Sequence, residues 1–86
     1  MKTFTHMIQN RMIIPFGPVS RLEEIANCYP DTTGTLKMGT RSADISRPLK
    51  VAAMGIRKGD SVTVSVEGPS EVEMFDVLCH YFDEAM

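Results

Sequence analysis

The stretch from Met54 to Gly68, MGIRKGDSVTVSVEG, limits the possible folds more than any other part of the chain. Apolar and hydroxyl residues alternate in its second half, which is typical of a β-strand with one buried and one solvated face. Gly55 follows an apolar run and can take the left-handed conformation that ends a helix. Gly59 follows two cations and makes a turn. We therefore expect a helix end, a turn and a central strand, with the remaining elements covering one face. The residues of that face are Val62, Val64 and Val66.

The length of 86 residues and the composition favour a single domain over residues 1–86. The formal net charge of −2 argues against direct binding to nucleic acid. No apolar run approaches the roughly 18 residues that a membrane helix needs. Lys2 is not followed by a long apolar segment, so we expect no signal peptide and a cytoplasmic location.

Cys28 and Cys79 both fall in apolar helical stripes, and we expect them to be buried apolar residues rather than a disulfide. Cys79 and His80 have no second Cys/His pair at ligand spacing, so we expect no metal site and no cofactor.

The N-terminal part predicts a strand from Lys2 to Gln9 and a helix that opens at Gly17-Pro18 and ends before Pro30. We expect His6 to be a half-covered, hydrogen-bonded strand residue, because the nearby sequence offers no partner for acid–base catalysis. The predicted buried face of the helix is Val19, Leu22, Ile25, Ala26 and Tyr29.

The middle of the chain predicts a hairpin of two weak strands, Thr35 to Lys37 and Arg41 to Ile45, at the edge of the sheet. Ala43 and Ile45 are expected to point inward. Ser46 is expected to cap a short helix that includes Pro48 at its start and continues to residue 54.

The last segment predicts a helix that begins with a capping box, Ser70 to Glu73. Its expected buried stripe is Val72, Phe75, Leu78, Cys79 and Phe82. The resulting order β-α-β-β-α-β-α predicts a two-layer α+β domain.

This order and the residues within it resemble HPr, the histidine-containing phosphocarrier protein of the sugar phosphotransferase system. The resemblance is strongest from Thr40 to Phe82 and implies an open-faced β-sandwich, a four-stranded antiparallel sheet covered on one face by three helices. The residues that carry it are Ser42-Ala43, Leu49-Lys50, Met54-Gly55-Ile56, Lys58-Gly59, Val62-Thr63-Val64-Ser65 and Gly68.

The loop that bears the phosphorylated histidine in HPr departs from the family pattern. Pro15 stands at the position of the histidine and Gly17 at that of the family's arginine, while Pro18 is kept. No histidine lies between His6 and His80, so shifting the alignment supplies none. The resemblance therefore implies a homologue without the phosphocarrier nucleophile.

A regulatory serine caps the short helix in many Gram-positive HPr proteins. Ser46 is the candidate for such phosphorylation here, although counting back from Gly55 places the family's serine at Arg47. The alternative is that Ser46 only caps the helix.

The resemblance also implies a face that binds other proteins. Four cations, Arg47, Lys50, Arg57 and Lys58, have no acid between them. The simpler interpretation is a solvated basic face, and the functional alternative is a docking surface for an acidic partner. Phe16 could be exposed beside Leu49 or could fold inward and plug the loop. The partner-binding candidates are Phe16, Arg47, Pro48, Leu49, Lys50, Ala52, Arg57 and Lys58.

We therefore expect a bacterial HPr-like protein that is not an enzyme and has a regulatory or protein-binding role in carbohydrate uptake or catabolite control. The resemblance implies partners among the phosphotransferase components or a transcriptional regulator, and no membrane. One alternative is a phosphocarrier that uses another residue. The other is a structural or oligomeric module of the same fold.

Overall fold

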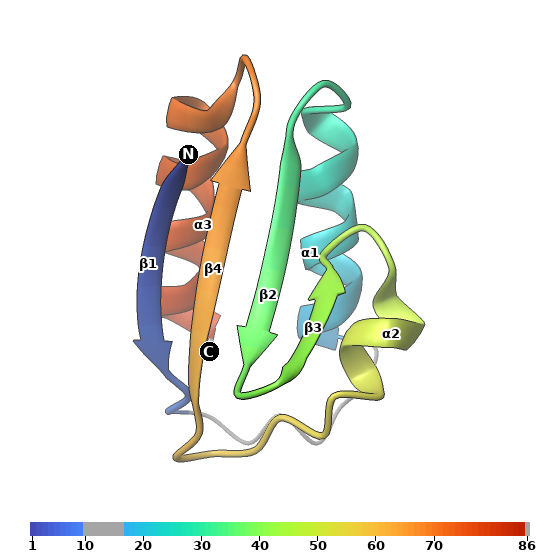
Figure 1. Ribbon diagram of the computed structural model, residues 1–86, viewed down its shortest axis with the longest axis vertical. Coiled ribbons are helices and arrows are strands. Elements are labelled where there is room, and N and C mark those ends of the chain that lie inside the picture. The colour runs from blue at the N-terminus through green and yellow to red at the C-terminus, as the bar shows by residue number, and fades with distance from the viewer. Residues whose placement is uncertain (10–16, 86) are drawn as a thin grey trace.

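The computed structural model describes residues 1–9 and 17–85 (Figure 1). The elements follow the predicted order of strands and helices. They are β1 Lys2–Met7, α1 Gly17–Cys28, β2 Thr33–Met38, β3 Arg41–Asp44, α2 Pro48–Ala52, β4 Ser61–Glu67 and α3 Glu71–Ala85. No helix in the described ranges is long and apolar enough to cross a membrane.

The four strands form one antiparallel sheet in the order β1-β4-β2-β3. The predicted central position of β4 is confirmed. The expectation that both hairpin strands lie at the edge is wrong for β2, which pairs with β4 on one side and β3 on the other. Gly34 hides the alternation of β2, because a buried glycine looks like a turn residue in the sequence. A Cβ at Gly34 would come within 2.7 Å of the Ile45 side chain.

The three helices cover one face of the sheet, with α3 behind β1 and β4 and with α1 behind β2 (Figure 1). The alternation of β4 places its valines in the core, each no more than 1% exposed. The expected inward positions of Ala43 and Ile45 are confirmed. Hydroxyl pairs occupy the uncovered face, where Thr5 Oγ1 and Thr63 Oγ1 lie 3.4 Å apart.

The buried stripe of α3 differs from the predicted one. Met74, Leu78 and Phe82 are fully buried, whereas Val72 is 57% exposed. A helix turns about 100° per residue, so Val72 and Met74 lie on nearly opposite sides, and the row spaced by four residues faces the sheet. Phe75 is partly buried against the core.

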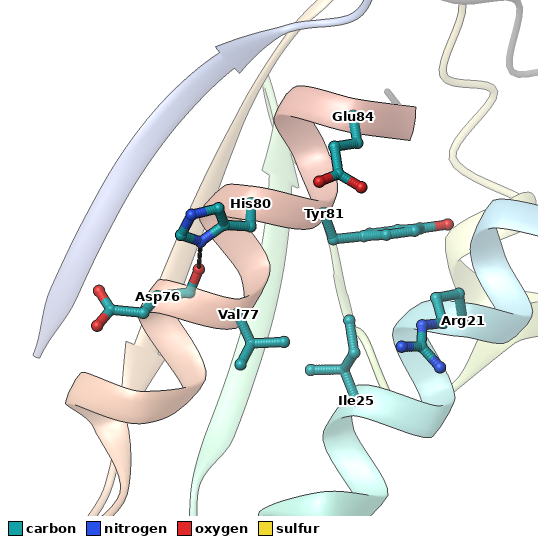
Figure 2. Close-up of a pocket in the computed structure, with 7 residues that line it drawn as sticks. All are labelled: Arg21, Ile25, Asp76, Val77, His80, Tyr81 and Glu84. Carbon is teal, nitrogen blue, oxygen red and sulfur yellow. Dashed lines mark hydrogen bonds between the residues drawn. The ribbon is translucent and has the colours of Figure 1, made fainter.

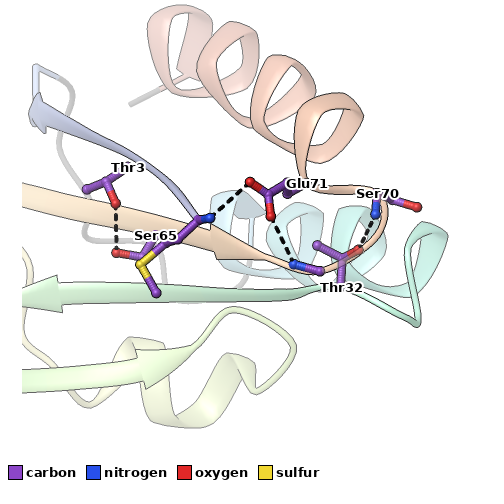
Figure 3. Close-up of polar contacts among 7 residues, drawn as sticks. Thr3, Thr32, Ser65, Ser70 and Glu71 are labelled. Carbon is purple, nitrogen blue, oxygen red and sulfur yellow. Dashed lines mark hydrogen bonds and ion pairs between the residues drawn. The ribbon is translucent and has the colours of Figure 1, made fainter.

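The start of α3 is held by Glu71 rather than by the predicted Ser70–Glu73 box (Figure 3). The Gly68 backbone N–H donates to Glu71 Oε1 at 3.4 Å, and the Ser70 N–H donates to Thr32 Oγ1 at 2.9 Å. The Met1 ammonium lies 3.1 Å from Glu71 Oε2. These contacts, first the ammonium and then the Gly68 N–H, lower the pKa of Glu71.

Both cysteines are free thiols. The expectation of burial is wrong for Cys28, which is exposed at the last residue of α1, where the buried face of that helix has turned away. Cys79 is only partly covered, but this burial, followed by the charges of Asp83 and Asp76, raises the pKa of its thiol.

Candidate functional site

The short helix α2 begins one residue later than the sequence suggested. Arg47 occupies the N-cap position, without a side-chain cap bond, and Pro48 is the first helical residue. The prediction that Ser46 caps the helix is therefore wrong. The Ser46 hydroxyl donates to Asp44 Oδ1 at 2.7 Å, and its backbone N–H donates to the same oxygen at 2.9 Å. The carboxylate at the end of β3 thus binds both donors of Ser46 before the helix starts.

The end of α2 is anchored to the sheet. Gly55 follows with φ 71°, the left-handed conformation expected from the sequence. Arg41 reaches from β3 and donates from Nη1 to the Met54 carbonyl at 2.9 Å. Because that carbonyl lies at the helix C-terminus, the guanidinium also complements the helix dipole. These contacts hold α2 in a fixed place beside β3.

The connection from α2 to β4 runs along the base of the molecule (Figure 1). Asp60 Oδ2 accepts the Arg57 backbone N–H at 2.9 Å and closes this turn. The Gly59 N–H donates to the Ile8 carbonyl, and the Ile8 N–H donates to the Asp60 carbonyl, each at 2.8 Å. Arg57 and Lys58 are therefore presented on a turn that is fixed to the end of β1.

The structure divides the predicted docking residues other than Phe16 into two parts. One part lies on α2 and its cap, and we call it the α2 surface: Arg47, Pro48, Leu49, Lys50 and Ala52. Leu49 is 74% exposed there, between the exposed cations Arg47 and Lys50. The other part, Arg57 and Lys58, lies on the basal turn.

None of these four cations forms an ion pair within residues 1–9 and 17–85. The neighbouring acids are engaged elsewhere, since Asp44 accepts from Ser46 and Asp60 accepts from the Arg57 backbone. The α2 surface is thus a basic rim around an exposed leucine. Such a surface attracts anionic protein surfaces through steering and complementarity.

Residues 10–16, which lead into α1, lie outside the described residues. They include Pro15 and Phe16, so the two expectations for Phe16 stay untested. Gly17 is the first residue of α1, as predicted, and α1 contacts α2.

His6 lies on the covered face of β1, where its ring meets the edge of Phe82 at a centroid distance of 5.4 Å. Its side chain is 13% exposed, and Nδ1 is 3.9 Å from Asp83 Oδ1. Nε2 is buried without a hydrogen-bond partner. Burial agrees with the prediction, but the expected good hydrogen bond is absent, and the acid that the nearby sequence lacked comes from α3.

His80 lies exposed on α3, with Nδ1 3.0 Å from the Asp76 carbonyl. The sequence contains two histidines in all, and neither belongs to the segment that leads into α1.

A family model described as "PTS HPr component phosphorylation site" matches residues 2–84. The chain belongs to the PTS HPr family. The predicted α+β fold and its relation to HPr are thereby confirmed, and so is the four-stranded sheet with three helices on one face.

Solved HPr structures share this fold. HPr-C-His from Thermoanaerobacter tengcongensis gives a TM-score of 0.83 at 19% identity, covering 96% of this chain and 92% of that one. The histidine-containing phosphocarrier protein in a structure on the divergence of Mycoplasma gives 0.82 at 17% identity, covering 93% and 90%. The phosphocarrier protein HPr from Bacillus anthracis gives 0.72 at 15% identity, covering 93% and 96%.

A search of curated protein sequences finds no match. At 15–19% identity the solved structures establish the architecture of this HPr-family chain. They assign no function to its individual residues.

Proposed function

We propose that this HPr-family chain does not carry a phosphoryl group on histidine and acts instead by binding another protein through the α2 surface. The observation that carries the proposal is the placement of its two histidines, His6 in β1 and His80 in α3. Family resemblance puts Pro15 at the nucleophile position and Gly17 at the position of the stabilising arginine.

His6 is a poor phosphoryl acceptor in this setting. Its Nε2 atom is buried, so a donor enzyme cannot bring a phosphoryl group in line with it. Its Nδ1 atom faces the Asp83 carboxylate, whose charge would repel the incoming anion. His80 is exposed, but it lies on a helix with five acidic residues and no Lys or Arg. Arg21, which lines the same groove from α1, is already paired with Glu24, so this acidic setting disfavours phosphoryl transfer to His80.

Serine phosphorylation is also disfavoured at the start of α2. The structural N-cap is Arg47, the position to which counting assigned the family's serine, and its side chain has no hydroxyl. A phosphate on Ser46 would replace a hydroxyl that donates to Asp44 and would place two anions together. The regulatory site at Ser46 is therefore the weaker alternative.

The partner that fits best is an acidic protein surface with an apolar pocket for Leu49. Such a surface would neutralise the unpaired charges of Arg47 and Lys50 while covering the leucine. Membership of the HPr family favours a phosphotransferase component or a transcriptional regulator of carbohydrate use as this partner.

The test is a phosphorylation assay on the purified chain. Phosphoenolpyruvate with the family's phosphotransferase enzyme, and ATP with HPr kinase, are supplied separately, and intact mass is read after each. A histidine-bearing HPr is the positive control for the first donor. We expect no added phosphate from either donor.

The possible additions of phosphate have distinct meanings. An acid-labile phosphate from phosphoenolpyruvate overturns the proposal and restores a carrier role. An acid-stable phosphate from ATP that is absent in Ser46→Ala replaces it with a serine-switched regulator.

A further inference from the structure

A groove runs between α1 and α3 on the side of the helix layer that faces away from the sheet (Figure 2). Its volume is about 320 Å³, at the lower end of the roughly 300–1,000 Å³ range of ligand pockets. Ile25 of α1 and Val77 of α3 point toward each other and form an apolar part of its lining, and the Tyr81 ring extends from α3 toward α1 (Figure 2). The groove is thus able to receive an aliphatic side chain.

Two acidic residues of α3 belong to the lining of the groove. The Glu84 carboxylate points toward the Tyr81 ring, whereas the Asp76 carboxylate points away from Ile25 and α1 (Figure 2). Asp76 and Glu84 line the groove from α3, and neither forms an ion pair within the described residues. Arg21 is the lining residue of opposite sign, but its Nη1 already lies 2.9 Å from Glu24 Oε2. The groove therefore carries a net negative charge beside its apolar part.

The placement of Glu84 strengthens this electrostatic imbalance. The C-terminal end of a helix carries a partial negative charge and favours cations, yet the last turn of α3 contains no basic residue. A cation brought to this end from another molecule would gain from both the carboxylates and the helix dipole.

The α2 surface has the complementary features. Leu49 projects with 74% of its side chain exposed, and the unpaired cations Arg47 and Lys50 flank it. An exposed aliphatic side chain flanked by cations is complementary in polarity and charge to an apolar groove whose rim carries acidic residues.

We propose that the α2 surface of one copy docks into the α1–α3 groove of a second copy, with Leu49 in the groove and its flanking cations against Asp76 and Glu84. The two surfaces can serve different neighbours, because α1 contacts both α2 and α3 and separates them across the helix layer (Figure 1). The contact is heterologous, so it continues from copy to copy in a head-to-tail chain.

Self-association of this kind covers Leu49, the same residue that the proposed function presents to another protein. The two uses then compete, and the partner-binding form is the free monomer. The inference does not rest on the absence of phosphorylation, so the phosphorylation assay and the association assay can fail independently.

The first test is sedimentation velocity of the unaltered chain from about 10 μM to about 1 mM, at about 0.05 M and about 1 M salt. We expect the weight-average sedimentation coefficient to rise with concentration at low salt and to return to the monomer value at high salt. A monomer at all concentrations, or an association that salt does not weaken, overturns the inference. This test needs no substitution.

Two variants separate the halves of the contact. Leu49→Gln/Lys50→Gln removes the projection and a cation, and Asp76→Asn/Glu84→Gln removes the groove carboxylates; all four side chains are exposed. We expect the dissociation constant of each variant alone to rise by about tenfold or more. The control Glu73→Gln removes an exposed acid of α3 that does not line the groove, and should associate like the unaltered chain.

Mixing the two variants gives the decisive result. The first keeps an intact groove and the second keeps an intact α2 surface, so a head-to-tail contact predicts that the mixture forms one-to-one dimers that grow no further. Circular dichroism of each variant confirms folding beforehand. A mixture that stays monomeric, or variants that associate normally alone, overturns the inference.

Discussion

Gly68 is the residue on which the junction between β4 and α3 depends. Its φ of 146° lies in a region that side-chain-bearing residues rarely adopt. A Cβ atom there would come within 2.7 Å of the Asp31 carbonyl oxygen and of Thr32 Cα, both of them backbone atoms. We expect Gly68→Ala to lower the free energy of unfolding by roughly 3 kcal/mol or more, measured by urea denaturation.

Gly39 is the matched control for that substitution. Its φ is 63°, but nothing lies within 4 Å of a Cβ built there. Gly39→Ala should therefore cost only the left-handed conformation, about 1–2 kcal/mol. Equal losses for the two variants would contradict the role assigned to the contact between Gly68 and the Asp31–Thr32 backbone.

Single residues near α2 show where sequence reasoning reaches its limit. The left-handed glycine at Gly55 was predictable, because an apolar run before a glycine signals a helix end. The N-cap of α2 could not be predicted, because a serine two residues before a proline is typical of an N-cap. Only the structure shows that Asp44 accepts the hydrogen bond of the Ser46 hydroxyl. His6 illustrates the same limit, because its acidic neighbour Asp83 is brought to it by the packing of α3.

The N-terminal turn of α3 depends on the Glu71 carboxylate. Its pKa is lowered from 4.5 by the Met1 ammonium and the Gly68 N–H, so Glu71 stabilises the fold above that pH. This stabilisation is lost as the pH falls through the lowered pKa of the folded state. We expect Glu71→Gln to reduce the urea midpoint at about pH 7, and the difference from the unaltered chain to shrink as the pH falls below 4.5.

Glu73→Gln provides the comparison within the same helical turn. Glu73 is also acidic and near the helix N-terminus, but it forms no hydrogen bond or ion pair in the described part of the chain. Its substitution should change the midpoint little at either pH. A Glu71→Gln deficit that persists unchanged in acid would show that shape, not charge, matters at this position.

The sequence predicts a strand or helix correctly where a single hydrophobic pattern dominates. It fails where packing against other elements determines the position or the buried face. The alternation of β4 identified a central strand, because its valines leave no other amphipathic reading. The interior position of β2 is hidden in the sequence by Gly34, whose missing Cβ leaves the space that the Ile45 side chain fills. In α3 a helical stripe could be drawn through Val72 or through Met74, and packing against the sheet selects Met74.

Positive and negative side chains are separated over the surface of the molecule. Cations gather on the α2 surface and the basal turn, whereas α3 carries acids and no Lys or Arg. The sequence revealed the basic run, since its cations lie close together along the chain. It could not reveal the acidic groove as its counterpart, because that groove forms only when α1 packs beside α3.

The buried residues form one cluster to which every helix and the sheet contribute, so the molecule should unfold as a unit. Phe82 is fully buried and its ring meets those of Phe4 and His6 at 5.5 and 5.4 Å. Phe82→Ala is expected to cost about 3–5 kcal/mol, a large share of the roughly 4–13 kcal/mol available to a domain of this length. Far-ultraviolet circular dichroism and tyrosine fluorescence should then report the same lowered midpoint.

Val72→Ala is the control, because this side chain is 57% exposed, and its free energy of unfolding should stay within about 0.5 kcal/mol of that of the unaltered chain. Separate midpoints for the two probes would instead mean that the sheet and the helices unfold independently.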